Sequence, residues 1–540
     1  MNKIILIGIV ISALMFSSCV KDLDVKPADP NSILGGNLND DPVYLKEVLV
    51  KIYASFLLPG QGGSQTSNGV DITAADPNFT TTTRALWNCQ ELTTDEAICA
   101  WGDAGIADFN TQTWTANNPF LTALYSRLVL SITYANDFIK LTGGNTNPDV
   151  VKYNSEARFL RVLAYYYAID LFGNPPFTTE AEGVGKFYPK QIKRIDLFNF
   201  ITSELKSIEN LLGAPGFSYP RADQGACWML LARLYLNGEV FTGTAKYDSC
   251  KMYCDKVISS GKYSLATKYR QNFSADNDYL QNKEMIFSWA SDGVNTQGYV
   301  GTTFLIESCS DGTHIDAHTL GLTSNTNWGG NRTKRQFLNV LVDTIATYGN
   351  VAVPWVTDTI FASCPDKRVL CKRLDYWNIP TPSSSYAFGI GVYKFTNFKS
   401  DGSQASNYNS AYASTDYPVF RYADALLMRA EALHRLNDNT NAVIDINAVR
   451  SRAYGNATGN ITADKVTDQF LLNERGREFY FEGQRRTDLI RFGQFSNGTY
   501  TWTWKGGNYN GIATDPHLNI FPIPGDEVSA NPNIKQNPGY

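Results

Sequence analysis

The sequence predicts a mainly α-helical fold, in which a tetratricopeptide-like helical scaffold carries a large, irregular, loop-rich half. Apolar residues recur at three- and four-residue spacing over many segments, which is typical of amphipathic helices. Several of these segments come in pairs of similar length separated by short polar breaks, as they do in helical repeats. The remaining stretches are rich in Gly, Asn, Ser, Thr and aromatic residues, and long irregular segments of this kind are uncommon unless they carry function.

The first predicted element is an export signal. Lys3 is followed by an unbroken apolar run, Ile4–Phe16. This run suits the core of a signal peptide and is shorter than the roughly 20 residues that a membrane-crossing helix needs. Two serines then lead into Cys19, and this small–small–Cys ending resembles the lipobox of bacterial lipoproteins, although Phe16 stands where leucine is usual. We expect residues 1–18 to be a lipoprotein signal peptide and Cys19 to be the lipid anchor. The alternative is a plain secretory signal.

Helical periodicity then predicts the scaffold. The clearest pair is 423–436 followed by 441–453, where small residues let neighbouring helices approach closely. The segment 156–173 ends at a glycine before Asn-Pro-Pro, which is a helix stop signal. The predicted helices are 40–58, 119–142, 153–172, 194–212, 221–238, 246–260, 418–436, 440–453 and 468–492.

The loop-rich half comprises residues 59–118, 264–417 and 494–540, with short strand-like pieces such as 284–290. We expect the helices to form a rigid scaffold and the loops to carry the recognition surface. Because no Pro/Ser-rich linker divides the chain, we expect residues 19–540 to form a single domain in which helices and loops are interleaved.

Bulk composition excludes several classes of function. The chain has 540 residues, 18% of them charged, and a net charge of −5 without a long basic run, so nucleic acid is not an expected partner. No later apolar stretch is long enough to span a membrane. The eight cysteines after Cys19 are too sparse for a disulfide scaffold and lack CxxC metal spacing. We expect most of them to be small core residues, although Cys364 and Cys371 could close a short loop.

No catalytic constellation stands out. The sequence contains no GxSxG elbow, P-loop or dinucleotide-binding glycine pattern. His314 and His318 superficially resemble a metal site, but their glycine-rich surroundings favour two surface histidines in a loop. Glu474, Glu478 and Glu482 lie four residues apart among arginines, and structural ion pairing explains this pattern better than acid–base catalysis.

Three aromatic residues are candidates for ligand binding. Trp101, Tyr299 and Trp328 lie among Gly, Asn and Asp rather than in a helical apolar pattern. A core aromatic residue normally has apolar neighbours, and these three do not. A sugar ring presents a flat C–H face and a hydroxyl edge, so aromatic rings with polar neighbours suit it.

At this point the motifs resemble the SusD/RagB family of outer-membrane, nutrient-binding lipoproteins. The similarity extends from the lipobox to the last residue, with the motifs in the same order and spacing as in the family. The segments that carry it are EARFLRVLAYYYAIDLFGNPPF (156–177), FRYADALLMRAEALHR (420–435), INAVRSRA (446–453), ERGREFYFEGQRRTDLIRFG (474–493) and FPIPGDEVSANPNIKQNPGY (521–540).

Within this family the likeness is greatest to the starch-binding prototype. The resemblance implies a non-enzymatic protein that captures starch or malto-oligosaccharides. It also implies a SusC-like TonB-dependent transporter as partner, and lipid anchoring on the outer membrane facing the cell exterior. Asp22 and Asp24 resemble the acidic residues that direct such lipoproteins to the cell surface. The aromatic arc of the prototype aligns with Trp101, Tyr299 and Trp328.

An arginine contact of the prototype aligns with Arg84, whereas Ala104 stands where the prototype offers a side-chain amide to the sugar. The alternatives are another glycan or a peptide in the same role, a surface glycoside hydrolase, or a mainly architectural role. No cofactor is expected. Asp276 and Asp278 could hold a structural calcium ion, with an ordinary solvated turn as the alternative.

Overall fold

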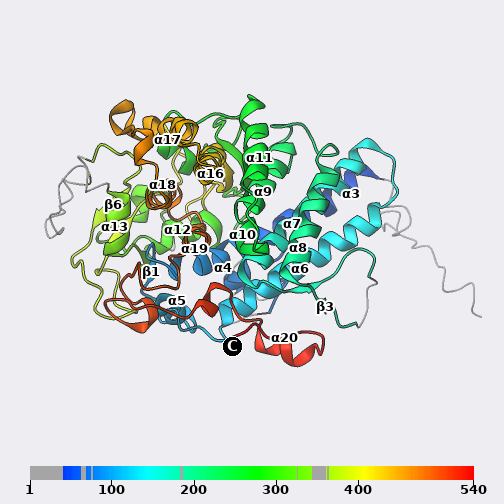
Figure 1. Cartoon of the computed structure of the whole chain (residues 1–540), viewed down its shortest axis with the longest axis horizontal. Helices are drawn as coiled ribbons and strands as arrows, with labels where there is room; N and C mark the ends of the chain where they lie inside the picture. The colour runs from blue at the N-terminus through cyan, green and yellow to red at the C-terminus, as the bar shows by residue number, and fades with distance from the viewer. Residues whose placement is uncertain are drawn as a thin grey trace, which may run out of the picture.

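The structure is a computed structural model, and it confirms a mainly helical fold with an irregular half. It describes residues 41–61, 69–73, 77–182, 187–324, 326–342, 361 and 364–540. The predicted signal peptide, Cys19, Asp22 and Asp24 lie outside these residues. Long helices dominate one side of the molecule, and short helices and strands joined by loops dominate the other (Figure 1).

The first helical group contains the longest pair. Helices α6 (Pro119–Thr142) and α7 (Pro148–Leu171) pack against each other, and α3 (Pro42–Leu57) lies on both. Asn118 and Asn147 cap the pair, each accepting hydrogen bonds from backbone N–H groups of the first turn, and a proline follows each cap. Helix α8 (Arg194–Ile208) packs against α7.

The second helical group continues the scaffold. Helix α9 (Gln224–Leu236) packs against α11 (Tyr247–Ser259), α11 against α16 (Tyr422–Arg435), and α16 against α17 (Asn439–Tyr454). The short helix α10 (Gly238–Thr242) follows α9. These successive helix pairs correspond to the repeat packing that the sequence predicts.

Two predicted helices differ from the structure. The helix expected over 468–492 is broken into α18 (Asp468–Phe479) and α19 (Arg485–Arg491). The break contains Phe481 and Gly483 with φ values of 62° and 75°, which a right-handed helix does not accommodate. The segment expected to begin a helix at 418 instead starts with strand β8 (Tyr417–Arg421), which pairs with β4 (Met285–Trp289) inside the predicted strand-like piece 284–290.

The loop-rich half contains several short elements within the predicted loops. They include two-stranded sheets and helices of one or two turns. The helices are α4 (Thr82–Trp87), α5 (Ile106–Thr111), α12 (Gly301–Ser308), α13 (Arg335–Leu341) and α20 (Gly525–Ala530). The strand pairs there are β1 (Ile98–Cys99) with β5 (Asn331–Arg332) and β6 (Cys371–Arg373) with β7 (Ile390–Val392). A further pair, β2 (Pro176–Phe177) with β3 (Lys190–Gln191), lies between α7 and α8, outside the predicted loops.

The acidic segment 474–482 forms a buried ion-pair network. Glu474 and Glu478 are fully buried, and Glu482, which follows the end of α18, is 5% exposed. Glu478 lies 3.0 Å from the Arg421 guanidinium, and Glu482 lies 2.7 Å from it. The further cationic partners of the three carboxylates are Arg368, Lys394, Arg450, Arg452 and Arg477. The geometry therefore favours the structural ion pairing inferred from the sequence.

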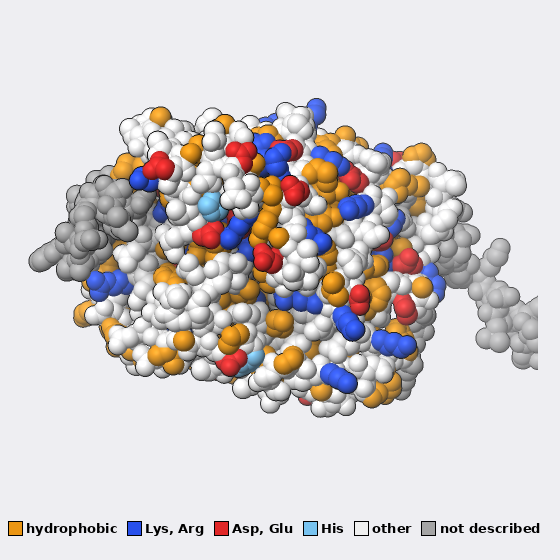
Figure 2. Space-filling view, viewed as in Figure 1, with side chains coloured by type: hydrophobic (Ala, Val, Ile, Leu, Met, Phe, Trp, Pro, Cys, Tyr) orange, Lys and Arg blue, Asp and Glu red, His pale blue; other side chains and the backbone are white. Residues whose placement is uncertain are grey.

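The eight described cysteines are all buried and unpaired, as expected of small core residues. Lys and Arg side chains are interspersed with Asp and Glu over the face shown in Figure 2. In the part of the chain that the structure describes, no helix is both long and apolar enough to span a bilayer.

Candidate functional site

A short β-ladder brings two of the three predicted aromatic residues together. Strands β1 and β5 pair in antiparallel register, and the pairing continues to a hydrogen bond of 3.0 Å from the Ala100 N–H to the Gly330 carbonyl. Trp101 therefore lies beside Trp328, although 227 positions separate them in the sequence. The Trp101 indole Nε1 donates to the Trp328 carbonyl over 3.0 Å, which fixes the orientation of its ring.

Helix α12 brings in the third ring. Tyr299 lies just before this helix, and its ring centroid is 5.5 Å from that of Trp328. The end of the helix binds the Trp328 loop, because the Trp328 N–H donates to the Glu307 carbonyl over 3.0 Å. At the other end of the helix, the Gly301 N–H donates to the Thr83 hydroxyl on helix α4 over 3.3 Å.

Arg84 on α4 joins the same site. Its guanidinium stacks over Phe79 at 4.5 Å and over Phe304 at 5.0 Å, and it lies 5.4 Å from the Trp101 ring centroid. Arg84 is only 5% exposed. The structure thus brings together all four residues that the sequence selected.

These residues line an open hollow of about 400 Å³, which we call the ring site. Its rings are not coplanar: Trp101 and Trp328 are inclined at 52°, and Tyr299 and Trp328 at 70°. All three rings are half-buried, so each packs on the protein and still presents surface to solvent. The residues that line the ring site are Asn78, Phe79, Arg84, Trp101, Asp103, Tyr299 and Trp328.

Sequence reasoning missed the residues that hold Trp328 in place. Asn327 has a φ of 67°, and its N–H donates to the buried Glu307 carboxylate over 2.8 Å. The Asn327 side-chain oxygen accepts from the Ala317 N–H over 2.9 Å. Burial raises the pKa of Glu307 to about 7. The position of Asn327 next to Trp328 was the sequence signal that could have identified it. Glu307 gives no such signal, because in the sequence it is an ordinary helix residue.

Phe79 and Asp103 are further members of the site that the sequence did not single out. Asp103 follows Trp101 by two residues and brings a carboxylate to the hollow. Ala104, next in the chain, is exposed and does not line it.

The other candidate residues lie outside the ring site. The His314 imidazole lies between Asp311 at 2.7 Å and Asp375 at 3.0 Å, and His318 is exposed. Asp276 accepts two hydrogen bonds from Ser400, and Asp278 accepts from backbone N–H groups of its own turn. Among the described residues no group of three His, Cys, Asp or Glu side chains could hold a metal ion. Calcium at Asp276 and Asp278 stays a prediction.

A helical scaffold that presents an open, ring-lined hollow defines a binding protein. The chain belongs to the SusD family, whose members are non-catalytic, in agreement with the expectation that it is not an enzyme. A profile of the SusD family matches residues 375–540. Over its whole length the chain is similar to the starch-binding protein SusD of Bacteroides thetaiotaomicron, with 35% identity covering 97% of this chain and 96% of that protein.

Solved structures show the same fold. A SusD-like carbohydrate-binding protein from Bacteroides fragilis superposes with a TM-score of 0.71 at 19% identity, covering 92% of this chain and 100% of the other. Surface glycan-binding protein A from Bacteroides thetaiotaomicron, solved in complex with laminarihexaose, superposes with a TM-score of 0.62 at 16% identity, covering 92% and 99% of the two chains.

Proposed function

We propose that this protein captures starch or malto-oligosaccharides at the cell surface and passes them to a SusC-like TonB-dependent transporter. The observation that carries the proposal is the ring site, where Trp101, Tyr299 and Trp328 converge beside Arg84. The 35% identity to a starch-binding protein supports an α-glucan as the ligand.

The inclination of the rings explains how such a site would select its ligand. Rings that are inclined to one another would suit a curved ligand better than a flat one, and a glycan chain that is already curved would match them. An α-glucan loses little conformational entropy when it binds in its own helical shape. Arg84, Asp103 and Asn78 add polar groups at the edge of the rings, where sugar hydroxyls would lie.

The anchor and the domain organisation complete the proposal. Removal of residues 1–18 would leave the acylated Cys19 as the first residue, and residues 19–540 would act as one domain on the outer surface of the outer membrane. Each buried acyl CH₂ group contributes about 0.8 kcal/mol, so several chains hold a protein firmly.

Affinity electrophoresis tests the ligand. The protein without residues 1–19 is run through gels that contain amylopectin, a β-glucan or no polysaccharide. Retardation by amylopectin alone, lost in Trp328→Ala, is the expected result. A mobility that is the same in all three gels contradicts the glucan assignment.

A β-glucan is the second candidate ligand. The observation that favours it is the structural likeness to a protein solved with laminarihexaose, although that likeness at 16% identity concerns the fold. Retardation by the β-glucan gel instead of the amylopectin gel would establish this alternative.

A further inference from the structure

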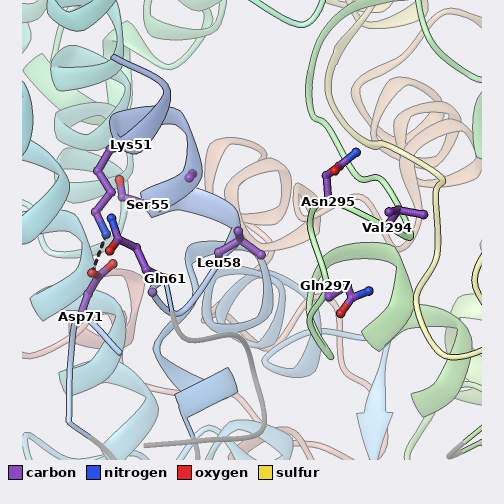
Figure 3. A pocket seen from close by; sticks show the side chains of 10 residues that line it. Lys51, Ser55, Leu58, Gln61, Asp71, Val294, Asn295 and Gln297 are labelled. Atoms are coloured by element: carbon purple, nitrogen blue, oxygen red, sulfur yellow. Dashed lines mark hydrogen bonds and ion pairs between the residues drawn. The ribbon is translucent and has the colours of Figure 1, made fainter. Parts of the chain in front are cut away.

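A second hollow adjoins the ring site, between helix α3 and the loop 292–297. It encloses about 360 Å³, and we call it the polar cleft. Figure 3 shows Lys51, Gln61 and Asp71 on one wall, Asn295 and Gln297 on the other, and Leu58 between them. The complete lining is Lys51, Ala54, Ser55, Leu58, Gly60, Gln61, Asp71, Val294, Asn295 and Gln297.

The α3 wall is built around Asp71. Its carboxylate binds the Lys51 ammonium at 2.8 Å and the buried Arg127 guanidinium at 2.9 Å. The Asp71 N–H donates to the Pro59 carbonyl over 2.9 Å, and this bond fixes the segment around Asp71 to the chain just after the end of α3. Two cations share the Asp71 carboxylate, but Arg127 is buried behind it, so the surface of the wall offers the Lys51–Asp71 ion pair and amides.

The opposite wall is equally fixed. The Asp292 carboxylate accepts from the N–H groups of Val294 and Asn295 at 2.8 and 2.9 Å. The Gly293 N–H donates to the Ser414 hydroxyl over 3.1 Å. A loop that is pinned in this way presents its outward side chains without a cost for ordering the backbone on binding.

The polar cleft and the ring site adjoin along two edges. On one edge, Gln297 and Tyr299 are two residues apart, so the chain between them spans at most about 7 Å. On the other edge, Arg127 holds Asp71 and also donates from Nε to the Thr80 carbonyl over 2.6 Å. Thr80 follows Phe79, which lines the ring site.

We infer that the polar cleft is a second subsite, which binds uncharged sugar units of the same glycan where the chain continues beyond the ring site. This inference rests on the proposed function. Amide groups donate and accept hydrogen bonds, as sugar hydroxyls do, and a carboxylate paired with an ammonium offers both roles side by side. The described lining holds amides, a hydroxyl, the Lys51–Asp71 ion pair and aliphatic groups rather than aromatic rings, so the polar cleft recognises hydroxyl edges and the ring site recognises sugar faces.

A comparison of two ligands on one variant tests the inference. The variant carries Gln61→Ala and Gln297→Ala, both at exposed positions. The first ligand is α-cyclodextrin, a closed ring that cannot continue into the polar cleft, and the second is a long linear malto-oligosaccharide. We expect affinity for the long chain to fall about tenfold, because two hydrogen bonds are lost, and affinity for cyclodextrin to stay within about twofold. The matched control is Gln281→Ala, an exposed glutamine outside both hollows.

The outcomes separate the two proposals. If the wild-type protein binds both ligands and the double variant keeps its long-chain affinity, the polar cleft is not a subsite. An equal loss of affinity for both ligands would mean that the substitutions, through Gln297, disturb the neighbouring Tyr299 in the ring site. That result also overturns the inference. A wild-type protein that binds neither ligand overturns the proposed function, and this inference with it.

Discussion

Gly330 lies directly against the indole ring of Trp101, and a β-carbon placed on Gly330 would come within 2.4 Å of it. The backbone at this position cannot withdraw easily. Its carbonyl accepts from the Ala100 N–H over 3.0 Å, and its N–H donates to the Ser308 carbonyl over 2.8 Å. The absence of a side chain at residue 330 therefore sets how deeply the Trp101 ring is seated in the ring site.

Gly330→Ala should displace the Trp101 ring and lower glycan affinity at least about tenfold. The overpacking should cost about 1–3 kcal/mol of stability, which leaves the protein folded. Isothermal titration with the glycan and a thermal melt measure the two effects. Gly102→Ala is the matched control, since a β-carbon there meets nothing within 4 Å. Normal binding by Gly330→Ala would show that the seating of Trp101 is unimportant.

Arg84→Lys should lower glycan affinity by about tenfold even though the charge is kept. A lysine ammonium cannot reproduce the planar stacking of the guanidinium on Phe79 and Phe304, or its fork of hydrogen-bond donors. The measurement is the dissociation constant by titration. Arg270→Lys is the control, because Arg270 stacks on Tyr393 outside the ring site. Equal affinities for Arg84→Lys and wild type would remove Arg84 from the ligand contacts.

The rings were predictable from the sequence, and their surroundings were not. Trp101, Tyr299 and Trp328 stand out because aromatic residues among Gly, Asn and Asp violate the local pattern of a core. Glu307 lies in a helical apolar segment and Phe79 among threonines, where neither residue type is unusual. Their roles arise from contacts between segments far apart in the sequence, such as the Glu307–Asn327 hydrogen bond.

The same limit applies to the fold. Long helices such as α6 and α7 follow from apolar periodicity, and their asparagine caps, each followed by a proline, are local signals as well. The break after α18 does not, because Phe481 adopts a φ of 62° where nothing in its residue type favours one. Tertiary contacts hold it: the Phe481 carbonyl accepts from the Trp87 indole over 3.3 Å.

Cys19→Ser should release the protein from the membrane fraction. A serine lacks the thiol that receives the lipid, so the exported protein would carry no lipid anchor. Metabolic labelling with radioactive palmitate, followed by membrane fractionation, measures the effect. Ser18→Ala is the control, because alanine is also small and leaves Cys19 intact. Labelling that persists in Cys19→Ser would place the anchor elsewhere.

Glu478→Gln should destabilise the fold by about 3–5 kcal/mol without changing glycan affinity. Burial alone would raise the pKa of Glu478, but the Arg452, Arg421 and Arg368 guanidiniums hold it below its ordinary value. Removing the carboxylate charge takes one negative partner from each of these three buried cations, and each is left with only its other carboxylates. Urea unfolding measures the loss, and a reducing-sugar assay on the wild-type protein should detect no glucan hydrolysis.

The control for Glu478→Gln is Asp464→Asn, which breaks an exposed ion pair of 3.2 Å with Lys465 and should leave the free energy of unfolding nearly unchanged. If the wild-type protein hydrolysed the glucan and Glu478→Gln abolished that activity at unchanged stability, the acidic segment would be catalytic instead of structural.

Glu307→Gln should make the protein more stable than wild type at pH 8 and nearly equal to it at pH 4.5. Burial, and less strongly Asp316, raises the pKa of Glu307 from its ordinary value of 4.5 to about 7. The folded state therefore binds this proton more tightly than the unfolded state, and the associated stability is lost as the pH rises through about 7. Glutamine does not titrate, and its side-chain oxygen can still accept from the Asn327 N–H.

The stability difference between Glu307→Gln and wild type should therefore grow by about 1–2 kcal/mol from pH 4.5 to pH 8, after allowance for screening by solvent. Urea unfolding at several pH values measures it. Comparing the variant with wild type cancels the other titrating groups, such as Glu91, whose pKa is also raised to about 7. Glycan affinity should be unchanged, because the hydrogen bond that positions Asn327 and Trp328 is retained. A stability difference that does not vary with pH would mean that Glu307 stays ionised in the folded protein, with the Asn327 N–H and its helix compensating the buried charge.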